Sequence, residues 1–233
     1  RLFYRSQTEN EQAHIASAFV FELSKVTLDK VPPRMVANLR NVDEDLAKRV
    51  AEGLGIDLPA KAKAAREPVD MDVSDALSIQ KQMKGTPEGR TVGILIADGT
   101  DAAELAALKD AVAKAKATAF VVAPKVKGAK LSDGSMAKAD GQLAGSPSQL
   151  FDAVAVLLSE PAARALTKEG AAVQWVMDAF GHLKTIGASA GAKPLLDKAG
   201  VEPDDGVMGA DAALAKAAGK RWFAREPKVR MLA

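Results

Sequence analysis

The chain has 233 residues, of which 48% are hydrophobic, enough for one medium-sized domain or for a smaller domain with an appended segment. Lysine and arginine number 32 against 30 acidic residues, and this near-balance argues against nucleic acid as a partner. There is no cysteine, and His14 and His182 lie far apart in sequence, so neither a disulfide nor a thiolate or histidine-rich metal site is expected.

No apolar run reaches the roughly 20 residues that span a bilayer, so we expect no membrane partner. The chain begins at Arg1 and enters a helical pattern at once, so we interpret it as a piece of a longer polypeptide. Whether that polypeptide is cytoplasmic or secreted stays open.

Residues 1–58 carry the signals of three short helices, which we expect over 8–25, 33–41 and 44–53. The clearest signal is a capping box formed by Thr8 and Glu11. The apolar stripes of these helices are too open for an independent core. We therefore expect this all-helical segment to pack on another part of the protein.

Residues 59–89 change in character. They mix proline, glycine, lysine and aspartate with little sustained periodicity. Such a composition predicts a long, partly ordered linker.

Residues 90–233 alternate between short apolar runs and helical patterns. The runs predict strands over 91–97, 119–124, 152–158 and 184–188. Asp133-Gly134 indicates a hairpin, and helices are expected over 98–117, 160–167, 170–181, 191–199 and 211–219. This alternation predicts an α/β fold, a doubly wound, flavodoxin-like sandwich with a parallel sheet.

Ligands of such sheets bind beyond the carboxyl ends of the strands, and two segments there carry candidate site residues. Asp98, Asp101 and Glu104 follow the first strand. A corner of small residues, 187–192, follows the fourth strand and contains Ser189.

Two interpretations of Ser189 and of Glu104 stay open. Ser189 lies in a Gly-x-Ser-x-Gly spacing, but no histidine follows it, so it is either a weak nucleophile candidate or a hydroxyl bonded to backbone. Glu104 is either a buried acid with a shifted pKa or a first-turn acid favoured by the helix dipole.

The opening stretch resembles the late helical part of large-subunit monofunctional haem catalases. The resemblance is dense and ungapped, and it rests on these residues: Arg1, Leu2, Phe3, Ser6, Gln7, Thr8, Glu11, Gln12, Phe19, Phe21, Glu22, Leu23, Ser24 and Lys25. That class adds a flavodoxin-like C-terminal domain after a long linker. Residues 90–233 resemble this domain, including its closing pattern of Arg225, Pro227 and Lys228.

The resemblance implies a parent protein that dismutes hydrogen peroxide with haem, as a tetramer. The haem-ligand tyrosine and the distal residues belong to parts of the catalase body outside this chain, so Tyr4 and His14 are not assigned to haem. We therefore expect no cofactor in this chain.

The C-terminal domain is in turn similar to the intracellular-protease and class I glutamine-amidotransferase-like superfamily. Active members carry Ile-x-x-Ile-Cys-His-Gly at the corner after the strand. Matching Ile186 and the pair Leu195-Leu196 places Ala190 at the cysteine and Gly191 at the histidine. Glu104 falls at the acid that partners the cysteine. The resemblance thus implies a vestigial elbow with no catalytic residues.

Three functions remain as hypotheses. The first is a non-enzymatic module that stabilises or assembles the parent catalase, with holdase activity toward unfolded client proteins as an extension. The second is a hydrolase or glyoxalase-like enzyme that uses Ser189 with Glu104. The third is a small-molecule binder, of flavin or a nucleotide, at the sheet edge.

Overall fold

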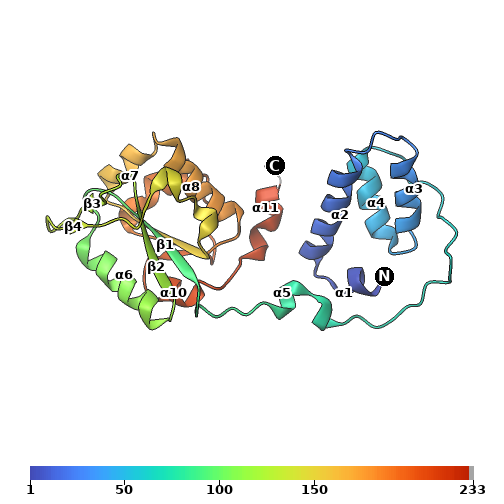
Figure 1. Cartoon of the computed structure of the whole chain (residues 1–233), viewed down its shortest axis with the longest axis horizontal. Coiled ribbons are helices and arrows are strands. Elements are labelled where there is room, and N and C mark those ends of the chain that lie inside the picture. Colours follow the sequence, from blue (N-terminus) through green and yellow to red (C-terminus); the bar gives the residue numbers. More distant parts are fainter. Residues whose placement is uncertain (231–233) are drawn as a thin grey trace. The chain divides into compact units, whose positions relative to one another are not determined.

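The structure, a computed structural model, describes residues 1–230 (Figure 1). The described chain separates into two compact units, one from Arg1 to Met83 and the other from Lys84 onwards. The last three residues of the predicted 90–233 domain lie outside the described range. No helix between residues 1 and 230 is long and apolar enough to cross a membrane.

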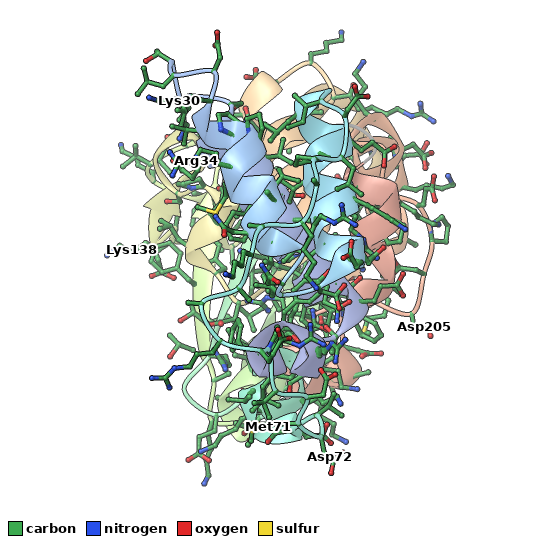
Figure 2. All side chains as sticks on the ribbon, turned by 90° about the vertical axis from the view of Figure 1, so that its right-hand side faces the viewer. Lys30, Arg34, Met71, Asp72, Lys138 and Asp205 are labelled. Carbon is green, nitrogen blue, oxygen red and sulfur yellow. The ribbon has the colours of Figure 1, made fainter. Side chains whose placement is uncertain are left out.

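The first unit is helical. Its helices are α1 (Leu2–Ser6), α2 (Glu9–Leu23), α3 (Val31–Leu39) and α4 (Glu44–Leu54). Val36, Leu46 and Val50 form its core together with the ring of Tyr4. Lys30 precedes α3 and Arg34 lies in its first turn, both at the same end of this helix (Figure 2). The three predicted helices are present, whereas α1 carried no periodicity from which to predict it.

The end of the predicted linker is hydrogen-bonded to this helical unit. It contains a 3-10 turn, η1 (Asp75–Leu77), and a short helix, α5 (Ile79–Gln82). Glu11 of α2 accepts hydrogen bonds from the Ser78 hydroxyl, at 2.8 Å, and from the Gln80 backbone N–H, at 2.9 Å. The capping box is confirmed, because Thr8 and Glu11 also bond reciprocally.

The second unit is built on a six-stranded parallel sheet with the order β5-β2-β1-β6-β7-β8. Its strands are β1 (Thr91–Ile96), β2 (Thr118–Ala123), β5 (Gly141–Gln142), β6 (Ala153–Leu157), β7 (Ile186–Ala188) and β8 (Val207–Gly209). Without the edge strand β5 this is the flavodoxin-like order, so the predicted doubly wound α/β sandwich is confirmed. The edge strands β5 and β8 were not predicted.

Helices cover both faces of the sheet (Figure 1). Helices α6 (Ala102–Lys114) and α10 (Ala212–Ala217) pack on one face. Helices α7 (Glu160–Leu166), α8 (Gly170–Gly181) and α9 (Lys193–Lys198) pack on the other. Strand β6 shows why its run is continuously apolar: Val154 and Val156 face the α8 side, while Leu157 faces the α6 side.

Outside the main sheet, β3 (Ala129–Lys130) and β4 (Met136–Ala137) pair antiparallel. The connection between them contains Asp133 and Gly134, and Gly134 has a φ of +88°, as a glycine-dependent turn requires. The hairpin predicted from Asp133-Gly134 is therefore confirmed.

The C-terminal segment is fixed to the amino edge of the sheet by buried polar contacts. It comprises η5 (Phe223–Arg225) and α11 (Glu226–Arg230). The Trp222 indole N–H donates to the Thr185 hydroxyl at 2.9 Å, and Arg225 donates to the carbonyl of Lys184 at 2.7 Å. Burial and the nearby Arg221 lower the pKa of Lys184 to about 8. The C-terminal segment is therefore attached to this edge of the sheet partly by buried charged side chains.

Candidate functional site

The predicted elbow lies between β7 and α9. Ser189 follows the strand directly, a 3-10 turn, η4 (Ala190–Ala192), comes next, and α9 continues from it. Small residues are required here, because a Cβ at Gly191 would lie 2.4 Å from the carbonyl oxygen of Leu158 and 2.7 Å from the backbone nitrogen of Glu160. The elbow is thus pressed against the chain that leaves β6, and position 191 has no room for a side chain.

The hydrogen bonds of the Ser189 hydroxyl are made with backbone groups. It donates to the carbonyl of Leu158 at 2.8 Å and accepts from the Leu158 N–H at 3.0 Å. Its φ of −72° is ordinary extended backbone, unlike the strained turn of a nucleophile elbow. His182 follows α8 and precedes β7, which places it toward the opposite, amino edge of the sheet. The geometry corresponds to the alternative in which this serine bonds to backbone.

Glu104 and the elbow line the same cavity, whose volume is about 800 Å³. Glu104 lies exposed in the first turn of α6, where its backbone N–H donates to Asp101, the residue that caps the helix. Ser189 and Ala190 contribute from the elbow, and Ala190 is exposed at its tip. The structure therefore brings the predicted site residues to one hollow, but Glu104 is not the buried acid of the first alternative.

A charged cluster at the end of β1 was only partly anticipated. Asp98 accepts from the Lys125 ammonium at 2.5 Å and from the Lys130 backbone N–H at 2.9 Å. The hydrogen bond from Lys125 is the main reason that the pKa of Asp98 lies below its usual value. Asp98 could be identified from the sequence because it follows a predicted strand. Lys125 follows β2 at the corresponding position, directly after Pro124.

Tyr4 and His14, neither of which is expected to bind haem, lie in the helical unit. Tyr4 is 4% exposed and belongs to the core of that unit. A hollow on the same unit is lined by residues such as Ala13, Val20 and Phe21, not by Tyr4 or His14. A haem on the Tyr4 oxygen would require this core to open, so the arrangement does not fit that group. Among residues 1–230, no three acidic or histidine side chains gather as metal ligands.

Comparison with known proteins gives consistent matches along the chain. Residues 88–220 match the family model of the C-terminal domain found in long catalases, and residues 1–54 match a model described as catalase-related immune-responsive. Catalase C of Rhizobium meliloti is 44% identical over 99% of this chain and 34% of its own length. Catalase HPII of Pseudomonas aeruginosa is 35% identical over 89% of this chain and 29% of its own length.

The chain thus spans about a third of the length of the curated relatives it matches. Its sandwich domain accounts for the larger family match and its helical unit for the smaller one. This chain belongs to the family of long catalases and carries their C-terminal domain.

Proposed function

We propose that this chain is a non-catalytic region of a long haem catalase and that it stabilises the subunit and its tetramer. The parent protein would supply the haem and the dismutation of hydrogen peroxide. The observation that carries the proposal is the state of the elbow. Ala190 stands at its tip, the Ser189 hydroxyl is taken by backbone, and Gly191 has no space for a base. Ala190, Gly191 and Glu104 are then remnants of a site rather than a working one.

The helical unit supports a structural role, because apolar side chains remain exposed on it. Phe21 is 62% and Leu28 is 59% exposed. Met71, on the extended segment before α5, is 61% exposed (Figure 2). Phe21 also lines a hollow with Ala13, Ala16 and Val20. A contiguous apolar surface of this kind is typical of one that another part of an assembly covers. The remainder of the catalase subunit is the cover that the family suggests.

The test is to compare the complete parent catalase with a form that ends after the residue equivalent to Met83. We expect peroxide turnover per haem to stay within about twofold, because no residue of the sandwich does chemistry. We expect the half-life of activity at elevated temperature to fall, because the stabilising contacts are lost. Loss of turnover at ordinary temperature, with haem content unchanged, would contradict the non-catalytic assignment.

The same exposed side chains favour holdase activity as a second candidate. We expect equimolar chain to reduce the light scattering of a heat-labile client enzyme, and the double variant Phe21→Ser, Leu28→Ser to lose most of this effect. The control is Val126→Ser, which removes a 77% exposed apolar side chain from the sandwich instead. If an inert protein at equal mass suppresses scattering as well as this chain does, the chain is no holdase.

A further inference from the structure

The strand order of the sandwich reverses between β1 and β6. From β1 the chain continues to β2 on one side, and it later returns to β6 on the other side. In open α/β sheets, ligands bind beyond the carboxyl ends of the strands at such a reversal. The elbow follows β7, which lies beyond β6 and therefore one strand away from this reversal. The topology therefore points to a different part of the carboxyl edge.

A hollow of about 250 Å³ lies at this point, lined by segments that follow β1 and β2 and by α7, which follows β6. Its walls include the apolar side chains of Ala129, Ala162, Ala165 and Leu166. An apolar cavity of about 150 Å³ holds a benzene ring. The hollow is thus large enough for one aromatic ring or a short branched alkyl group.

The rim of this hollow carries a positive excess. Asp98 and Lys125 both line it and pair with each other. The loop that follows β2 adds Lys130, whose backbone N–H donates to Asp98 and whose charge lies close enough to act on that carboxylate. The Lys125 side chain is 69% exposed, and one of its three N–H groups donates to Asp98. One carboxylate therefore faces two lysines, Lys125 and Lys130, and Lys125 has hydrogen atoms left to donate.

We propose that this crevice binds small apolar carboxylates, with the apolar group against α7 and the carboxylate on the Lys125 ammonium. The apolar walls and the cationic rim together favour this class of ligand. A neutral molecule of the same shape would make only the apolar contacts with the walls, and a small inorganic anion would make only the ionic contact at the rim. The site is separate from the elbow and goes beyond the structural role proposed above.

Titration of the complete chain with sodium benzoate, followed by amide chemical shifts, tests the proposal. We expect saturable shifts over residues 97–98, 125–130 and 162–166, with a Kd of about 1 mM, as suits a ligand of this size. Benzyl alcohol, a neutral molecule of similar shape, should bind roughly tenfold more weakly because it lacks the charge-assisted hydrogen bond.

Matched variants separate the walls from the rim. Lys125→Gln should weaken benzoate about tenfold, to the level of benzyl alcohol. Ala165→Leu should abolish the binding of both by filling the hollow. Lys193→Gln, which removes a similarly exposed lysine that pairs with Asp197 on α9, should change nothing. Absence of saturable shifts at ten times the expected Kd overturns the proposal. So does equal binding of benzoate and benzyl alcohol, or an equal effect of the two lysine variants.

Discussion

Replacing Arg225 with alanine is expected to lower the free energy of unfolding of the sandwich domain by about 3–5 kcal/mol. Arg225 is 1% exposed, and two of its nitrogens bond to the Asp204 carboxylate at 2.5 and 2.8 Å. A third nitrogen donates to the carbonyl of Lys184 at 2.7 Å. The substitution leaves a partly buried carboxylate without its cation and a buried carbonyl without its donor, and each loss is costly.

The same substitution should raise the pKa of Asp204. Burial raises this pKa, but the hydrogen bonds from Arg225 and from the Gly206 backbone N–H outweigh it, so the pKa lies below its usual value. Without Arg225, burial is opposed only by the remaining contacts. Because the folded pKa then lies closer to the reference value of 3.8, Arg225→Ala should lose less stability than the parent chain as the pH falls below about 4, and the difference between the two should narrow in acid.

Tryptophan fluorescence during urea unfolding measures this effect, because both tryptophans, Trp175 and Trp222, lie in the sandwich. The control is Lys228→Ala. Lys228 pairs with Glu202 at 2.6 Å, but both side chains are more than half exposed, so the expected change is below about 1 kcal/mol. A change of under 1 kcal/mol for Arg225→Ala would show that the buried pair is not what fixes the C-terminal segment.

The long elements of both units could be predicted from the sequence because each has a local cause. Strand β6 is a continuous apolar run, and α2 begins with a capping box. Both elements can therefore be predicted from residues that are close together in the sequence. Strands β5 and β8 have only two or three residues and no periodicity. They exist because β2 and β7 offer open edges, which is information that lies far away in the chain.

The candidate site divides in the same way. The corner at 187–192 was predictable, because small residues after an apolar run indicate a tight turn. A backbone partner for the Ser189 hydroxyl was one of the two predicted alternatives, but which residue provides it could not be predicted, because Leu158 is separated from Ser189 by two helices. The role of Arg225 was equally hidden, since its partner Asp204 is 21 residues away and surface arginines are the ordinary case.

Replacing Glu11 with glutamine is expected to destabilise the helical unit by about 3 kcal/mol at neutral pH. Glu11 is 9% exposed, and burial alone raises its pKa, but hydrogen bonds from Thr8, Gln80 and Ser78 outweigh burial and lower the pKa to about 2. The reference value is 4.5, and a difference of about 2.5 corresponds to about 3 kcal/mol.

The sign of the pH dependence follows from the direction of this shift. Because the pKa is lower in the folded chain, the ionised Glu11 contributes its full stability above pH 4.5, and the contribution is lost as the pH falls toward 2. Glutamine does not ionise, so the variant should lack this part of the acid dependence. The parent chain and the variant should become equally stable near pH 2.

The hydrogen bonds of Glu11 show which contact the Glu11→Gln substitution would break. One Glu11 oxygen accepts from the Thr8 N–H and the Ser78 hydroxyl, and the other accepts from the Gln80 N–H at 2.9 Å. The amide oxygen of glutamine can replace only one of them, and its NH₂ then opposes a donor. If the oxygen keeps the capping box, the NH₂ faces Gln80 and the segment 78–82 is released from α2.

Hydrogen exchange of the complete chain resolves this outcome by position. Faster exchange is expected at 78–82, with smaller changes in α4, while the tryptophan-reported unfolding of the sandwich stays unchanged. Glu9→Gln is the matched control, because Glu9 lies exposed in the same first turn of α2. If both glutamine variants lose the same stability, the effect belongs to helix-dipole charge at the start of α2, and Glu11 does not hold the linker to the helical unit.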